Sequence, residues 1–137
     1  MAFAREIRIR FSHLDSAGVV FFPRYFALAH DLFEDLLAEM GFSWAEWFDN
    51  PRWIAPFRIV EAEYLRPLRG GETCRASLGI LRLGTSSATL LCTLSRVGER
   101  VAALRLVIVF VSRKTGRKIA IPPAVRRRLK GAAGRSS

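Results

Sequence analysis

The residues most able to do chemistry lie together in one short segment, 13–25, which reads HLDSAGVVFFPRY. It places the carboxylate of Asp15 on a loop before Pro23, a residue that fits the first position of a helix because it has no N–H. A helix start presents free backbone N–H groups and a partial positive charge. A carbonyl bound there would have its oxygen on amides and its carbon facing a carboxylate, as in an oxyanion hole with a base or nucleophile. Spacing alone also fits a structural role, with Asp15 capping the turn or the helix.

Other kinds of catalytic site find little support in the sequence. There is no glycine-rich nucleotide loop, no GxSxG and no HExxH motif. Only two histidines are present, so a metal site would depend on carboxylates. Cys74 and Cys92 each lie in an apolar stretch, without the spacing of a metal site or a disulfide framework. We therefore expect no metal and no bound cofactor, and a reduced, cytoplasmic protein.

A long amphipathic helix is predicted directly after the candidate segment, over residues 23–40. Its apolar residues recur at three- and four-residue spacing, and four acidic residues form the opposite face. Gly41 is a typical helix stop. Alternating or apolar runs then predict strands, with turns at glycines and prolines between them. The predicted strands are 3–12, 57–65, 73–83, 86–97 and 101–112, with a short edge piece at 118–121, a helical turn within 42–48 and a last helix over 124–130.

This order segregates the helix from the run of strands, which favours an α+β fold with one sheet wrapped around one long helix. The chain has 137 residues, half of them hydrophobic, which suits a single domain over 1–137 with a packed core. No apolar run approaches the roughly 20 residues of a membrane-spanning helix, and the first residues do not resemble a secretory signal.

The charge of the chain is concentrated at one end. The formal net charge is +10, and residues 113–137 contain nine basic residues and no acidic one. The rest of the chain is therefore close to neutral. Such a basic segment attracts phosphate groups of any kind, but it is also compatible with a plain solvated tail.

Three motifs resemble hotdog-fold acyl-CoA thioesterases of the 4-hydroxybenzoyl-CoA thioesterase type, and together they cover about residues 3–130. The first is the Asp15 segment, whose Phe11, Gly18, Pro23 and Tyr25 fit the family pattern D-x-x-G followed by apolar and aromatic residues, then P-x-Y. The second is the strand and turn over 62–72, AEYLRPLRGGE. The third is LGTSS at 83–87, which is similar to the family's start of the next strand.

The resemblance implies a curved antiparallel sheet of about five strands around a central helix, in a dimer or tetramer with active sites at a subunit interface. It implies that Asp15 is the catalytic aspartate and that the backbone amide of Phe22 polarises the substrate carbonyl. Gly18 falls on the glycine that lets the loop approach the ligand. His13 is a further candidate for the catalytic site.

Other residues are candidates for substrate binding on the same resemblance. Arg82 and the basic segment 113–118 could meet the phosphates of coenzyme A, and Ser87 could contact the pantetheine. Ala55 stands where the hydroxybenzoyl enzyme has a hydroxyl, which argues against 4-hydroxybenzoyl-CoA itself.

Arg24 replaces a common Asn, Glu72 replaces the usual Asp without expected harm, and His30 is assigned to packing or an interface. The remaining candidates around the acyl group are Phe21, Tyr25 and Phe57.

The expected function is hydrolysis of an aryl- or medium-chain acyl-CoA to the free acid and coenzyme A, with 4-hydroxybenzoyl-CoA or a related aromatic thioester among the candidate substrates. Asp15 would act as nucleophile or as general base on water, and the sequence does not choose between these roles. Two alternatives stay open: a non-catalytic hotdog module that binds an acyl chain or a partner, and an RNA-binding protein that uses the basic end. The second is disfavoured because no aromatic residue follows Phe110 within the basic segment.

Overall fold

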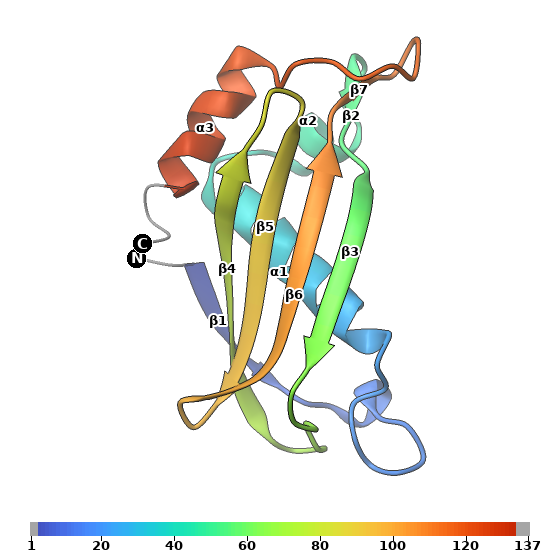
Figure 1. Cartoon of the computed structure of the whole chain (residues 1–137), viewed down its shortest axis with the longest axis vertical. Helices are drawn as coiled ribbons and strands as arrows, with labels where there is room; N and C mark the ends of the chain where they lie inside the picture. The colour runs from blue at the N-terminus through green and yellow to red at the C-terminus, as the bar shows by residue number, and fades with distance from the viewer. Residues whose placement is uncertain (1–2, 134–137) are drawn as a thin grey trace.

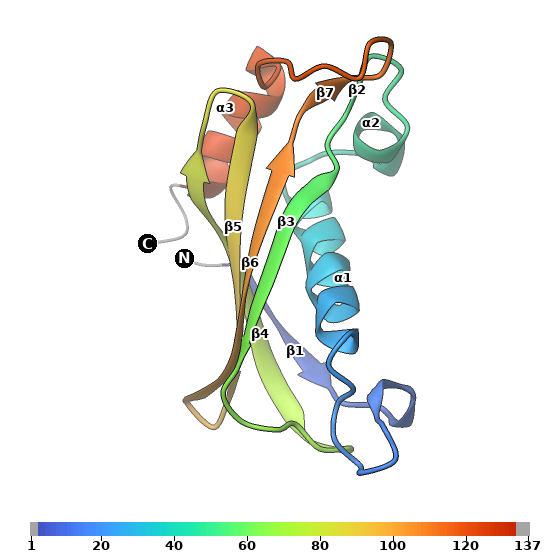
Figure 2. The ribbon, with the colours of Figure 1, turned by 45° about the vertical axis from the view of Figure 1, so that its right-hand side comes forward.

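A computed structural model describes residues 3–133, in which one antiparallel sheet packs against one long helix (Figure 1). The five strands lie in the order β1-β4-β5-β6-β3. The helix α1 (Arg24–Glu39) runs across one face of the twisted sheet, as Figure 2 shows from the side. This arrangement confirms the predicted α+β fold. The strands are β1 (Phe3–Arg8), β3 (Phe57–Tyr64), β4 (Thr73–Leu83), β5 (Ser87–Arg96) and β6 (Glu99–Val109).

The core lies between α1 and the sheet. The apolar stripe of α1 is buried, with Leu32 and Phe33 almost inaccessible to solvent. Alternate residues of the central strands face it, among them Leu78 on β4 and Leu90 on β5, because side chains on a strand point to opposite faces in turn. The register places Leu106 of β6 beside Leu90, so that one continuous apolar layer covers the helix.

Three smaller helices and a small second sheet complete the described chain. They are η1 (Phe11–His13), a 3-10 turn; α2 (Trp44–Phe48), capped by Ser43; and α3 (Pro123–Ala133), which lies beside β4 (Figure 1). The short strands β2 (Trp53–Ile54) and β7 (Val111–Ser112) pair with each other. The predicted basic segment 113–137 extends beyond this range, and its residues 134–137 lie outside the described residues.

Two predicted strands end earlier than expected. The strand predicted over 3–12 stops at Arg8, because the N–H of Arg10 bonds the Nδ1 of His13 and winds the chain into η1. The strand predicted over 101–112 is divided at Phe110, whose N–H donates to Ser86 O before β7 turns to pair with β2. The edge piece predicted at 118–121 is reduced to one bridge between Val111 and Lys118.

Candidate active site

Asp15 lies in a tight turn between η1 and α1. Its N–H donates to Val19 O at 2.9 Å, and its carbonyl accepts from the N–H of Gly18 at 3.1 Å. One carboxylate oxygen, Oδ1, accepts from the N–H of Ala17 at 2.8 Å. Within residues 3–133, no protein group hydrogen-bonds the other oxygen, Oδ2, and the side chain is exposed. Asp15 therefore does cap its turn, as the structural interpretation predicted, and it still presents a free carboxylate oxygen.

Gly18 is the residue that closes this turn. Its φ is +80°, in the left-handed region that favours glycine, and a Cβ built on it would meet no atom within 4 Å. The backbone conformation, rather than lack of space within the chain, is therefore the reason for a glycine here.

The Asp15 turn rests on the segment 66–72 that precedes β4. The N–H of Val20 donates to the carbonyl of Leu68 at 2.8 Å, and the Leu68 side chain is fully buried. Gly70 allows a close approach, since a Cβ there would lie 2.8 Å from the Cδ1 of Leu14. The second family motif thus forms the support of the first.

An ion pair holds the supporting segment in place. Arg96 on β5 lies 2.9 Å from both carboxylate oxygens of Glu72 and also donates to Pro67 O at 3.1 Å. The Oε1 of Glu72 accepts from the N–H of Arg69 at 2.6 Å. Glu72 therefore fixes both the turn and the guanidinium, which gives a physical account of a carboxylate at this position.

The backbone N–H of Phe22 is the candidate hydrogen-bond donor that would polarise the substrate carbonyl. Among residues 3–133, no backbone or side-chain acceptor receives a hydrogen bond from it. The preceding carbonyl, of Phe21, accepts from the N–H of Arg24 at 2.8 Å, so this peptide group is held against the start of α1. Pro23 occupies the N-cap position of α1 rather than its first turn. A free N–H beside a helix N-terminus can receive a carbonyl oxygen that gains negative charge.

Two further predicted residues lie beside this amide. Tyr25 is buried, and its ring centroid is 5.0 Å from that of Tyr64 on β3. Phe21 is 45% exposed and packs edge-on against Phe22 at 5.4 Å. The structure therefore brings Asp15 and Gly18 into the same loop as the Phe21–Tyr25 segment, at one end of α1.

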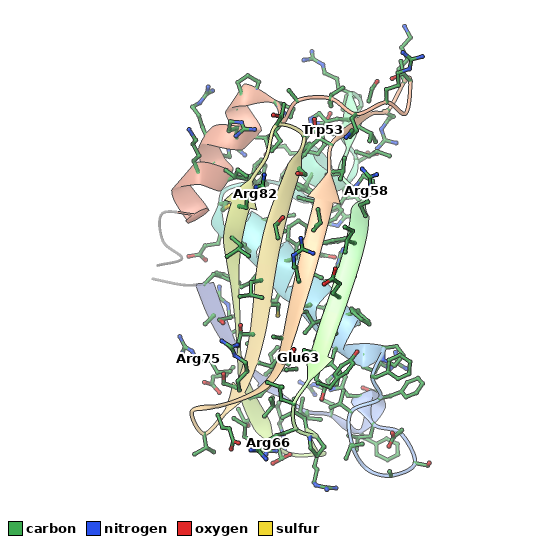
Figure 3. The ribbon with its side chains drawn as sticks, in the orientation of Figure 1. Trp53, Arg58, Glu63, Arg66, Arg75 and Arg82 are labelled. Carbon is green, nitrogen blue, oxygen red and sulfur yellow. The ribbon has the colours of Figure 1, made fainter. Side chains whose placement is uncertain are left out.

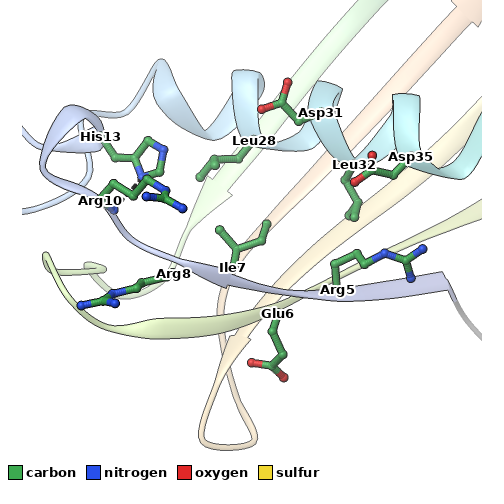
Figure 4. A pocket seen from close by; sticks show the side chains of 10 residues that line it. All are labelled: Arg5, Glu6, Ile7, Arg8, Arg10, His13, Leu28, Asp31, Leu32 and Asp35. Atoms are coloured by element: carbon green, nitrogen blue, oxygen red, sulfur yellow. Dashed lines mark hydrogen bonds between the residues drawn. The ribbon is translucent and has the colours of Figure 1, made fainter. Parts of the chain in front are cut away.

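The ring of His13 is engaged on the other side of this loop. Its Nδ1 accepts from the N–H of Arg10 at 2.9 Å, and its carbonyl accepts from the N–H of Phe21. Burial lowers the pKa of His13, helped by the charges of Arg10 and Arg24. The imidazole lines one end of a groove of about 350 Å³ between β1 and α1, which Asp31 of α1 also lines (Figure 4). In the structure, the His13 ring thus stabilises η1 through its hydrogen bond with the N–H of Arg10.

An apolar pocket of about 120 Å³ opens between α1 and the edge strand β3. Phe57, which stays a predicted substrate-binding residue, lies here together with His30, which was predicted to serve in packing or an interface. The Nδ1 of His30 is 3.5 Å from Glu34 Oε1, and its ring is 5.4 Å from that of Phe57. The four-residue spacing of Phe26 and His30 on α1 was the available sequence signal, but their partners on β3 follow only from the fold. The pocket is lined by Phe26, His30, Phe57, Val60 and Leu106.

Three other predicted residues lie toward the opposite end of the sheet from the Asp15 turn. Arg82 is exposed near the end of β4, toward α3, whereas Glu63 and Arg66 lie toward the other end (Figure 3). Ser87 begins β5, with its Oγ packed against Gly84. Ala55 is half-buried between β2 and β3. Within one copy of the chain, these residues are not brought together with Asp15.

The basic segment is used partly for structure. Arg126 on α3 donates to Gly84 O and Thr85 O, and so attaches α3 to the turn between β4 and β5. Arg128 lies over the ring of Phe42 at 4.5 Å and pairs with Glu46 at 3.4 Å. Residues 113–118, in the turn between β7 and α3, are all exposed. The basic side chains of this turn are therefore accessible to an anion, as are those of Arg127 and Lys130 on α3.

No cluster of three or more His, Cys, Asp or Glu side chains that could hold a metal ion occurs among residues 3–133. None of the helices described there is long and apolar enough to cross a membrane.

Residues 9–129 match the family model described as the thioesterase-like superfamily, and the chain belongs to that superfamily. The chain is similar to the 1,4-dihydroxy-2-naphthoyl-CoA hydrolase of Thermosynechococcus vestitus, with 35% identity over 95 residues. That match covers 69% of this chain and 65% of the relative, so it spans just under two thirds of the relative's length.

Solved structures share the fold over nearly the whole chain. A 1,4-dihydroxy-2-naphthoyl-CoA thioesterase from Synechocystis superimposes with a TM-score of 0.87 at 17% identity, covering 95% of this chain and 96% of its own. A Staphylococcus aureus protein solved in complex with CoA gives a TM-score of 0.90 at 16% identity, covering 100% of this chain and 87% of its own. At these identities the likeness establishes the hotdog fold.

Proposed function

We propose that this protein is a thioesterase that hydrolyses an aromatic acyl-CoA to the free acid and coenzyme A. The observation that carries the proposal is that one loop at the start of α1 holds both Asp15 Oδ2 and the N–H of Phe22, neither of which has a hydrogen-bond partner among residues 3–133. Membership of the thioesterase-like superfamily supports the same reaction class.

In the proposed mechanism the thioester oxygen accepts a hydrogen bond from the N–H of Phe22, close to the positive end of α1. Charge that develops on this oxygen in the transition state is stabilised there, and a preorganised donor of this kind typically contributes about 10²–10³ in rate. The Oδ1 of Asp15 stays on Ala17, which leaves Oδ2 directed by the turn for reaction.

Two chemical roles fit Asp15. As a nucleophile, its carboxylate attacks the thioester carbon and expels the coenzyme A thiolate, leaving a mixed anhydride that water then hydrolyses. As a general base, it takes a proton from a water molecule that attacks the same carbon directly. Rapid quenching during one turnover separates the two, because only the first role gives a transient increase in protein mass equal to the acyl group.

The pocket between α1 and β3 supports an aromatic acyl group. Its walls carry the rings of Phe26, His30 and Phe57 together with two aliphatic side chains, and this composition suits edge-to-face contacts with an aryl ring. His30 is the one polar group in this lining, and its ring nitrogens are able to meet a hydroxyl substituent. The curated relative's name, 1,4-dihydroxy-2-naphthoyl-CoA hydrolase, points to the same substrate class.

We further propose that two copies share each active site, in a homodimer that can pair again into a tetramer. The strand β3 is at an edge of the sheet, with β6 as its partner on one side only. If β3 pairs antiparallel with β3 of a second copy, the Phe57 end of one strand lies near the Tyr64 end of the other. The apolar pocket and the residues Arg82 and Ser87 of one copy would then approach the Asp15 turn of its partner.

A panel of thioesters tests the substrate class directly. Steady-state kinetics would compare benzoyl-, 4-hydroxybenzoyl- and 1,4-dihydroxy-2-naphthoyl-CoA with acetyl- and octanoyl-CoA. We expect the highest kcat/KM for an aromatic thioester. A preference for octanoyl-CoA would show that the substrates are medium-chain acyl-CoAs. Tight acyl-CoA binding without any turnover would show that the protein is a binding module and not an enzyme.

A further inference from the structure

Tyr64, at the end of β3, reaches across to the segment that carries the candidate oxyanion donor. Its hydroxyl donates to the carbonyl of Phe22 at 3.1 Å, over a sequence separation of 42 residues. Its ring lies 5.0 Å from that of Tyr25 and 6.5 Å, edge-on, from that of Phe22. Burial raises the pKa of Tyr64 above its ordinary value of 10.0, so the hydroxyl keeps its proton and remains a donor at neutral pH.

The geometry on both sides of Phe22 explains why this contact matters. The peptide group before it is fixed by the 2.8 Å bond from the N–H of Arg24 to Phe21 O. The peptide group after it has no N–H, because Pro23 follows. Its carbonyl therefore depends on two donors, the N–H of Tyr25 at a long 3.3 Å and the Tyr64 hydroxyl. Among residues 3–133, the Tyr64 hydroxyl is the one side-chain group that hydrogen-bonds the backbone of segment 21–25.

We propose that Tyr64 is a positioning residue: by holding the Phe22 carbonyl it limits rotation of the Phe22 backbone, so that the Phe22 N–H, in the preceding peptide group, points to the place that the thioester oxygen occupies. This inference rests on the proposed function, since it assigns a supporting role in the same site. A hydrogen-bond donor accelerates a reaction only if it is already aimed at the developing charge. With one of its two carbonyl contacts removed, the backbone at Phe22 can rotate, and the N–H would spend part of its time pointing away.

The same contact links the active site to the sheet edge. β3 is the strand that the proposed dimer would use, and Tyr64 is its last residue. The position of the Phe22 backbone therefore depends on the position of this strand, through the hydrogen bond of Tyr64 and its ring contacts with Phe22 and Tyr25.

The Tyr64→Phe variant isolates the hydrogen bond, because it keeps the ring contacts with Tyr25 and Phe22. We expect kcat to fall about tenfold, less than the 10²–10³ that removal of an oxyanion donor costs, with KM within about twofold of wild type. The matched control is Ser77→Ala, which also deletes a hydroxyl that donates to a backbone carbonyl, that of Thr93, on the face of the sheet away from α1. The control should keep the wild-type kcat.

A second measurement separates positioning from general stability. Replacing Tyr64 with a fluorinated tyrosine gives a phenol that ionises nearer neutral pH and cannot donate once ionised. In this variant kcat should fall with rising pH, at constant KM, over a range in which the wild type is flat. A structural role alone would instead lower the thermal midpoint and reduce the active fraction without this pH signature.

The outcome is decided independently of turnover by the ¹⁵N–¹H NMR signal of Phe22. We expect this signal to shift and broaden in Tyr64→Phe and to stay unchanged in Ser77→Ala. An unchanged Phe22 signal, or wild-type kcat in Tyr64→Phe, overturns the inference. If the wild-type protein hydrolyses no thioester, the proposed function fails, whereas the NMR comparison still decides whether Tyr64 orients the Phe22 peptide.

Discussion

Replacement of Gly18 by alanine tests whether the turn geometry at Asp15 is a requirement of activity. At φ +80° an alanine is strained, and L-residues in the left-handed region cost about 1–2 kcal/mol. No atom lies within 4 Å of the added Cβ, so steric overlap within the chain contributes nothing further. The expected loss of stability is about 1 kcal/mol, or about 3–6 °C in thermal midpoint for a chain of this size.

The matched control is Gly98→Ala, in the turn between β5 and β6. Gly98 has a φ of +73° and the same free space around its Cβ, so it carries the same strain away from the Asp15 turn. Both variants should therefore lose similar stability in thermal unfolding. Only Gly18→Ala should lose activity, by about tenfold or more in kcat/KM, because a displacement of a catalytic group by 1 Å can cost about 10²-fold. Equal kcat/KM in the two variants would refute a role of the Gly18 turn in catalysis.

Three further predictions concern pH, charge and assembly. The pKa of His13 is lowered below its ordinary 6.5 in the folded protein, so unfolding takes up a proton below that pH. The free energy of unfolding should therefore be retained above pH 6.5 and decline as the pH falls through the lowered pKa. Chemical denaturation at pH 7.5 and 5 would measure this decline, which should be smaller in His13→Gln. Replacing Lys114, Arg117 and Lys118 together by Gln should raise KM about twofold to fivefold at 10 mM salt and leave kcat unchanged. The difference in KM should vanish at 500 mM salt, where charges are screened within a few ångströms. An unchanged KM at low salt would mean that these charges interact with solvent and not with the substrate. Light scattering at micromolar concentration should give the mass of at least two chains, and a monomer would contradict the shared site.

The elements that form the active-site loop could be predicted because their signals are local. The stripe of α1 and the alternation of β4 depend on periodicity within one segment, and Thr73–Leu83 has the predicted bounds. Gly18 also has a local basis, since glycine is the residue suited to a φ above zero and the φ here is +80°. The role of Asp15 in capping its own turn also follows from a local contact, with Ala17.

Features that depend on distant partners could not be predicted in this way. The pairing of β2 with β7 joins two strands of two residues each, too short for any periodic pattern. The surroundings of His30 depend on Phe57 from another strand, and the hydroxyl of Tyr64 reaches a carbonyl 42 residues earlier in the chain. The early end of β1 has a different cause, because it comes from a local contact: the His13 ring takes the N–H of Arg10, and the alternating pattern of residues 3–12 does not indicate this.

The most direct test of the proposed reaction is kcat of Asp15→Asn on the best aromatic acyl-CoA of the panel. Asparagine keeps an Oδ1 that can accept the N–H of Ala17, so the turn should be preserved and the thermal midpoint should hardly move. Asp35→Asn, the same exchange on the exposed face of α1, controls for the change of charge. We predict a loss of kcat of about 100-fold or more in Asp15→Asn, because general-base catalysis alone contributes about 10²–10⁴, and wild-type turnover in Asp35→Asn. Near-wild-type kcat in Asp15→Asn would contradict the assignment of Asp15 as the catalytic carboxylate.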